Sequence, residues 1–287
     1  MIEGRIMPKA ARADLWAPAN FPAPQWLGPR KQAHATGAQA VLWTSLSALV
    51  LVAAWQGLSW FIGFDVLPGP LSSVLAVDDV LHEGYFWSDI GITTYRIAGA
   101  FSMALVGSVV AGALLGASAP AARLFGSWVT IGASIPSLVT IVVVYLAVGI
   151  NDYAAMIGTA LLVAPTMTHA VWDGMRAINP ELQEMARAFA VPHFTILRRV
   201  VVPQTLPFIF TAARTGLVLT WRLMIFVELL GRSSGIGYRI QYFYNLVDMK
   251  RVIATALPFI ALMLVAEFGF LRPLERSVFR WRKVEAR

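Results

Sequence analysis

The sequence has 287 residues, of which 57% are apolar and only 14% are charged, and its mean hydropathy is +0.65. Soluble domains carry about 25% charged residues, so this composition excludes a water-facing domain and favours a helical membrane protein. The chain has no cysteine, which excludes disulfides and thiolate metal sites. We attribute its net charge of +7 to membrane topology rather than to nucleic-acid binding.

The N-terminal region contains no membrane-spanning pattern. Residues 1–6 include Ile-Glu-Gly-Arg, a common engineered protease site, so we interpret them as an added leader with the native start near Met7. Residues 8–35 are rich in proline, alanine and aromatic residues and contain no apolar run. We therefore expect residues 1–40 to form a cytoplasmic tail rather than a signal peptide.

Six apolar segments follow, and each approaches the length of roughly 20 residues with which a helix crosses a bilayer core. They cover residues 41–62, 96–118, 126–149, 153–172, 205–230 and 252–271. The sequence thus predicts an all-α, polytopic membrane protein with six transmembrane helices. Its membrane domain extends over residues 41–271, and a basic tail over 272–287 follows.

The distribution of lysine and arginine indicates how these spans are oriented, because both residues concentrate in cytoplasmic loops. They occur in the N-terminal tail, after the second and fourth spans and in the C-terminal tail, whereas the loops after the first and third spans contain none. We therefore expect both termini in the cytoplasm. The loop 231–251 disagrees, because it carries four basic residues although it is predicted outside, and we interpret it as packed into the protein.

The second span contains three small residues at four-residue spacing, Ser108, Gly112 and Gly116. Small residues at this spacing let two helices approach closely in lipid. The contact lies either within one subunit, which we favour, or between two subunits.

The third span contains Ser134, Pro136 and Ser137. A proline in a membrane helix frees a carbonyl group and can kink the helix toward a pathway. These three residues are candidates for a translocation path, and packing is an equally good interpretation.

The loop 173–204 is too long for a simple connection between helices. Asn179 is a suitable N-cap and Pro180 suits the first helical position, after which apolar residues recur along one helical face. Pro192 ends this helix, and a second short amphipathic helix follows at about 193–201. A bent helical pair of this kind can fit a groove on a partner or lie on the lipid surface.

The residues Glu184-Met185-Ala186, Ala190 and Pro203 resemble the EAA signature of ABC importer permeases, and the spacing matches throughout. That signature is Glu-Ala-Ala, three residues, Gly, nine residues and Ile-x-Leu-Pro. Met185 replaces the first alanine and Ala190 replaces the glycine. We expect Ala190 to keep a helical or extended backbone, with the break supplied two residues later by proline.

The resemblance covers about residues 85–283 and implies a type I ABC importer permease fold with a cytoplasmic coupling helix. It implies two cytoplasmic ABC ATPase subunits that bind ATP and Mg, a periplasmic substrate-binding protein and a second copy of this chain, in the bacterial inner membrane. No cofactor and no nucleic acid are expected in this chain itself. By position, the coupling residues are Glu181, Glu184, Met185, Ala186, Arg187, Ala190, Pro192 and Pro203.

A second stretch is similar to the subgroup of permeases that imports nitrate, sulfonates, taurine and related compounds. It comprises Trp221, Glu228 and the segment Ser234-Gly235-Ile236-Gly237. The resemblance implies a small anionic solute of the nitrate, sulfonate, taurine or aromatic carboxylate class.

Four charged residues fall within the last two predicted spans: Arg214, Arg222, Glu228 and Glu267. A charge at the bilayer centre costs about 2.5–3.5 kcal/mol on insertion scales, so these residues are expected to face protein or water. The two arginines share a helical face. Arg222 either helps an anion to pass, with Glu228 as a further candidate on the path, or forms a structural ion pair with one of the glutamates.

Two other functions stay open, although the sequence predicts no catalytic or metal-binding residue and contains no phosphate-binding loop. One is a self-sufficient secondary transporter, for which we find no internal repeat. The other is an intramembrane hydrolase that uses Ser134 and His169, which lie in neighbouring predicted spans.

Overall fold

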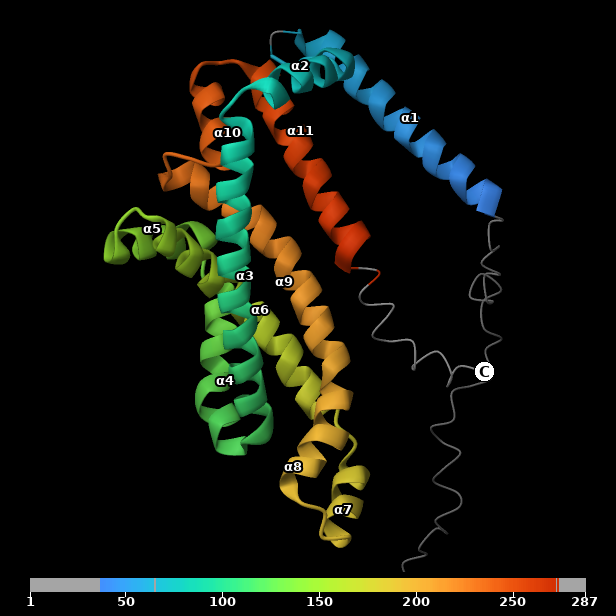
Figure 1. The fold of residues 1–287 in the computed structure, drawn as a ribbon, viewed down its shortest axis with the longest axis vertical. Helices are drawn as coiled ribbons and strands as arrows, with labels where there is room; N and C mark the ends of the chain where they lie inside the picture. The colour runs from blue at the N-terminus through green and yellow to red at the C-terminus, as the bar shows by residue number, and fades with distance from the viewer. Residues whose placement is uncertain (1–36, 65, 272, 274–287) are drawn as a thin grey trace, which may run out of the picture. The chain divides into compact units, whose positions relative to one another are not determined.

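In the computed structural model, residues 37–64, 66–271 and 273 are described, and every regular element among them is helical (Figure 1). The leader 1–6, most of the tail 1–40 and nearly all of the tail 272–287 lie outside the described residues. Contacts divide the chain into two units, 1–53 and 54–287. The elements are α1 (Gly37–Ile62), α2 (Pro70–His82), α3 (Phe86–Ala117), α4 (Ala119–Ser134), α5 (Ser137–Val148), α6 (Asp152–Arg176), α7 (Pro180–Ala188), α8 (His193–Ile196), the π-helical η4 (Leu197–Val201), α9 (Val202–Gly231), α10 (Ile236–Asn245), α11 (Met249–Val265) and the π-helical η5 (Ala266–Leu271).

Five helical stretches within the described residues are long and apolar enough to cross a membrane, or six when a bent pair is counted as one span. The five are 41–62, 86–117, 152–176, 193–231 and 249–269. The first matches its predicted bounds, whereas 86–117 and 193–231 begin well before the predicted starts at residues 96 and 205. These two helical stretches are longer because polar residues at their ends continue the backbone hydrogen bonds of the helix. A prediction from apolar run length leaves such residues out.

The predicted third span is two helices rather than one, because α4 and α5 meet at an angle of 101°. The break falls at Ile135, which is extended, directly before Pro136. Steric contact with the proline ring moves the preceding residue out of the helical region. The expected kink is therefore present, but it turns the chain too sharply for a continuous span 126–149.

The second unit is built around α6, which packs against both α3 and α9. The Ser108 hydroxyl donates to the Ala164 carbonyl at 3.0 Å. A Cβ atom on Gly112 would overlap the side chain of Val171, and one on Gly116 would overlap Met175. The small residues of α3 thus pack closely on α6, which confirms the contact within one subunit.

The two predicted outside loops, 63–94 and 231–251, contain helices that their composition did not predict. These are α2 and α10, and α2 packs against α11 while α10 packs against α9 and α11. The core beneath them includes Phe86, Phe243 and Ile236, each almost fully buried. Both loops are therefore folded parts of the second unit, which confirms that 231–251 is packed into the protein.

Helix α7 ends in a left-handed residue that contradicts our expectation for Ala190. Its φ angle is +49°, and the backbone bonds Ala190 N–H to Arg187 and Val191 N–H to Ala186 form a Schellman motif. The alanine adopts the conformation that the glycine of the signature favours, so the break is made before Pro192. Val247 ends α10 in the same way, with φ +59°.

Replacing either residue by glycine is expected to stabilise the protein, because an L-residue pays about 1–2 kcal/mol for this conformation. Ala190→Gly and Val247→Gly should each raise the thermal unfolding midpoint of the purified protein. Both side chains are exposed, so little packing is lost. Ala188→Gly, in the last helical position of α7, is the matched control and should not raise the midpoint. A lower midpoint for both cap variants would contradict the assigned backbone.

Candidate functional site

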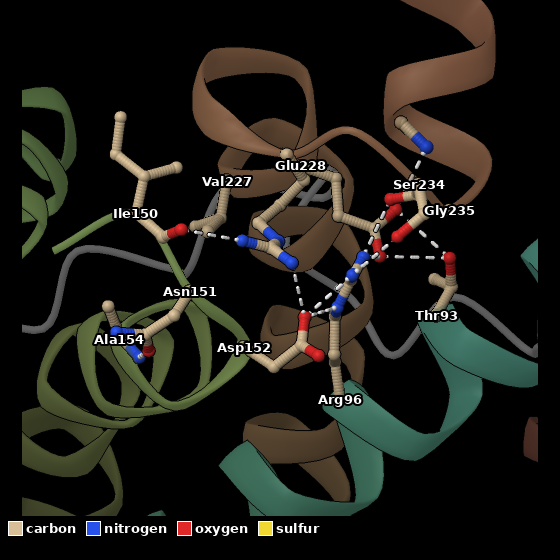
Figure 2. A network of polar contacts seen from close by, with 12 residues as sticks. Thr93, Arg96, Ile150, Asn151, Asp152, Ala154, Val227, Glu228, Ser234 and Gly235 are labelled. Carbon is tan, nitrogen blue, oxygen red and sulfur yellow. Dashed lines mark hydrogen bonds and ion pairs between the residues drawn. The ribbon is translucent and has the colours of Figure 1, made fainter.

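A buried ion pair joins α3 to the end of α9 (Figure 2). The Arg96 guanidinium lies 2.6 Å from the Glu228 carboxylate, and both side chains are fully buried. Each of these charges would be unstable alone in an apolar interior, so the pair needs further polar partners. The surrounding residues supply them.

The Glu228 carboxylate accepts hydrogen bonds from two groups besides Arg96. The Thr93 hydroxyl lies 2.9 Å from both carboxylate oxygens. The Gly237 backbone N–H donates at 2.9 Å, and Thr93 in turn accepts from the Ile236 N–H. The segment after α9 thus folds around the glutamate and begins α10 beside it.

The two glycines of the Ser-Gly-x-Gly segment are required by this geometry. Gly235 has φ +103°, and a Cβ atom there would lie 2.5 Å from the Glu228 carboxylate. A Cβ atom on Gly237 would overlap the Ile225 carbonyl and the glutamate side chain. The motif therefore lets the backbone approach a carboxylate closely.

Arg96 also extends the network to α6 and to the loop after α9. Its Nε and Nη2 atoms lie 2.8 and 2.7 Å from Asp152 Oδ1, at the start of α6. It further donates to the carbonyl and the hydroxyl of Ser234. Arg232 pairs with the same Asp152 oxygen at 2.7 Å and donates to the Ile150 carbonyl. Figure 2 shows these contacts converging from three helices.

A second ion pair explains why the basic loop 231–251 is stable beside acidic segments. Asp89 of α3 accepts from the Gly235 N–H and pairs with Arg239 of α10 at 2.8 Å. Arg239 also lies 3.8 Å from the ring of Tyr85, whose pKa burial raises to about 12, so the ring stays neutral. Arg251 lies 3.8 Å from Glu83. Three of the four cations of this loop therefore have acidic partners in the described structure.

The network can hold helices together, but no solute can reach its centre. Arg96 and Glu228 are fully buried, and the described residues contain no group of acidic or histidine side chains suited to a metal ion. We therefore correct the assignment of Glu228 to a translocation path, since its carboxylate is fully used by protein donors. Sequence reasoning missed Arg96, Thr93 and Asp152, although an arginine at the start of an apolar span is a signal for a buried partner.

The predicted coupling segment lies at the other end of α6 and α9 (Figure 1). The Asn179 side chain accepts from the Glu181 N–H, which confirms the predicted N-cap. The Asn179 N–H donates to the side chain of Gln204, which fixes the start of α7 against α9. Helices α8, η4 and α9 run on without a break, so Pro203 lies in the first turn of α9 rather than between two helices.

The exposed side chains of α7 and α8 include large apolar ones. Phe189 and Phe194 are 76% and 72% exposed, and Met185 is 53% exposed. Ala186 is buried, whereas Glu181, Glu184 and Arg187 are exposed. The segment therefore combines an apolar surface with both signs of charge, between the end of α6 and the start of α9.

Three further predicted path residues lie at the bend between α4 and α5. Ser134 and Pro136 are exposed and Ser137 is half-buried. The Ser134 hydroxyl donates to the Thr130 carbonyl, and His169 Nε2 lies 3.5 Å from Thr130 Oγ1. No hydrogen bond joins Ser134 to His169 in this described region, so the pair that a hydrolase requires is not formed.

Helices long enough to span a membrane, several of them joined by the buried ion network, define a multi-pass membrane protein. The family model of the binding-protein-dependent transport system inner membrane component matches residues 103–278, more than half of the chain. The chain therefore belongs to this family, the permeases of ABC importers.

Related proteins agree with this assignment. A Brucella abortus protein named as an ABC transporter permease is 26% identical over 243 residues, 83% of this chain and 94% of the relative. SsuC of Escherichia coli, named for the transport of aliphatic sulfonates, is 28% identical over 239 residues, 80% of this chain and 88% of SsuC. NrtB of Synechococcus elongatus, named as a nitrate import permease, is 23% identical over 213 residues, 68% of this chain and 74% of NrtB.

Solved structures confirm the predicted fold. A chain of the MetNI methionine ABC transporter in an inward-facing conformation has a TM-score of 0.58 and 22% identity, covering 67% of this chain and 94% of that chain. A chain of an amino acid ABC transporter solved with histidines has a TM-score of 0.56 and 18% identity, with the same coverage. At these identities the likeness shows the fold, which is that of the type I importer permeases.

Breaking the buried ion pair is expected to destabilise the protein strongly. Glu228→Gln or Arg96→Gln leaves one charge without its partner, and such changes cost about 3–5 kcal/mol. Thermal unfolding of purified protein should show a large loss for each variant and a smaller further loss for the double variant, because the two residues act together. Strictly additive losses would contradict direct coupling between the two side chains.

Proposed function

We propose that this chain is the membrane subunit that couples ATP hydrolysis on a separate ABC ATPase to the import of a small anionic solute. The observation that carries the proposal is the bent pair α7–α8, between α6 and α9, where Met185, Phe189 and Phe194 are exposed. Exposed apolar side chains beside mixed charges suit a protein partner better than water. ATP and Mg belong to that partner and not to this chain.

The coupling residues follow from the family resemblance and the geometry of α7. Glu181, Glu184 and Arg187 form its charged surface, while Ala186 packs inward and Ala190 ends the helix. The hydrogen bond from Asn179 to Gln204 connects α7 to α9. A force on α7 is therefore transmitted to α9, whose other end lies at the buried ion network.

The segment lies on the cytoplasmic side in this proposal, with both termini there as well. Helix α6 has 25 residues, which span about 37 Å, enough to cross a hydrocarbon core of about 30 Å. Asp152 begins α6 at the network, and α7 follows its other end. The network and the loops 63–94 and 231–251 then face the periplasm, where a substrate-binding protein would deliver its solute.

The assembly that we propose contains two copies of this chain and two ATPase subunits in a bacterial inner membrane. The relatives named for sulfonates and nitrate support a solute of the nitrate, sulfonate, taurine or aromatic carboxylate class. A stand-alone secondary transporter is the remaining alternative, and ion-gradient-driven uptake in vesicles without an ATPase would favour it. The exposed α7–α8 surface has no role in that alternative.

A charge placed on the apolar coupling surface should release the ATPase. We expect Phe189→Asp to reduce the amount of ATPase that copurifies with the chain by at least about tenfold, because burial of a carboxylate in an apolar contact is costly. Glu184→Lys should likewise uncouple ATP hydrolysis from uptake or release the ATPase. Copurification and uptake in proteoliposomes measure both effects.

Phe64→Asp is the matched control, since Phe64 is also exposed but follows α1 in the loop 63–94. It should leave copurification of the ATPase unchanged. Normal copurification and uptake in both the Phe189 and the Glu184 variants would contradict the assigned coupling surface.

A further inference from the structure

Helix α9 carries a polar stripe on one face of its membrane-spanning part. Thr211, Thr215 and Arg222 are exposed, and Arg214 and Val218 are half-buried between them. Their spacing of three and four residues places them on one side of the helix. The stripe covers twelve residues, 211–222, and about 16 Å from end to end, which is roughly half the thickness of the hydrocarbon core.

These residues line a groove of about 390 Å³. Small-molecule sites have volumes of about 300–1,000 Å³, so a small solute fits. The groove contains two guanidinium groups and no carboxylate among its lining residues. Its nearest acidic neighbour is Glu267 of η5, which lies 3.3 Å from Arg214.

Arg222 has no hydrogen bond or ion pair among the described residues, and both glutamates that could neutralise it are already paired. Glu228 is buried against Arg96, and Glu267 pairs with Arg214. The same glutamates would be occupied in a second copy of the chain. The structural ion pair that we considered from the sequence therefore does not form with either residue.

An arginine in this position cannot face lipid without a cost of about 2.5–3.5 kcal/mol on insertion scales. Charged residues in spans face protein or a water-filled cavity, and Arg222 lines the groove. On a helix, side chains lean toward the N-terminus, so Arg222 leans toward Val218 and Thr215. The guanidinium and the Thr215 hydroxyl then offer donors to the same groove.

We propose that this groove binds the transported solute through an oxyanion group, with the Arg222 guanidinium as its main partner. The proposal rests on the proposed function and adds the place and the chemical group that is recognised. A guanidinium binds two oxygens of a nitrate, sulfonate or carboxylate at once, which selects these groups over halide ions and neutral solutes. Arg214 adds positive potential, while its pairing with Glu267 keeps the net charge of the groove moderate.

The test uses the purified complex of this chain with its ATPase in a maltoside detergent, which has no phosphate group. Methanesulfonate is the probe and dimethyl sulfone, of similar shape but neutral, is its control, at matched ionic strength. We expect saturating methanesulfonate to raise the thermal midpoint of the unchanged complex by about 2–4 °C, and dimethyl sulfone to leave it unchanged. Arg222→Gln should abolish the rise, and Arg222→Lys should retain part of it.

Lys250→Gln is the matched control, because it removes an exposed cation at the start of α11 and should keep the full rise. The ATPase should still copurify with Arg222→Gln and retain its basal hydrolysis. If no ATPase copurified even with the unchanged chain, the proposed function would fail, which is a different result from loss of the anion response.

Three outcomes would overturn the anion site. The first is an equal rise with Arg222→Gln or with dimethyl sulfone. The second is failure of Arg222→Gln to assemble, which would assign Arg222 a structural role. The third is an Arg222-dependent rise with added phosphatidylglycerol but none with methanesulfonate, which would identify a lipid phosphate as the occupant.

Discussion

The ion pair between Arg96 and Glu228 is the interaction on which the second unit depends. Two opposite charges that are fully buried lose their hydration, and their attraction alone seldom compensates for this loss. Here the carboxylate also accepts from Thr93 and from the Gly237 backbone, and the guanidinium also donates to Asp152 and Ser234. The charges are therefore tolerated only when α3, α6, α9 and the start of α10 are all in place, which makes the pair a condition for correct assembly.

The same network explains features of the loop 231–251 that its sequence alone leaves unexplained. The Ser-Gly-x-Gly segment needs glycines because its backbone lies against the Glu228 carboxylate. The basic loop 231–251 is compatible with its predicted side because Arg232 and Arg239 are paired with Asp152 and Asp89. A count of basic residues treats these cations as free, whereas folding places them beside acids from distant parts of the sequence.

The two ends of α9 make different contacts. One end is fixed in the network, and the other continues without interruption from α8, beside the exposed apolar residues of α7. Between them lies the polar stripe with Arg222. A continuous helical stretch, 193–231, thus connects the proposed ATPase contact, the proposed solute groove and the buried ion network, so that a movement at one end can be transmitted along its length. This continuity suits the coupling role that we propose.

The sequence by itself determined the all-helical membrane fold, the bounds of three of the six membrane spans to within a few residues, and the N-cap at Asn179, because apolar run length and cap chemistry are local properties. The EAA resemblance also identified the family, which the family match confirms. Only the tertiary structure decided which charges meet, since Arg96 and Asp152 find their partners through contacts between segments far apart in the chain. It also decided the left-handed backbone at Ala190 and the sharp bend before Pro136, where local preference gave the wrong or an incomplete answer. For the charges, the deciding energy comes from neighbours that are absent from the local sequence.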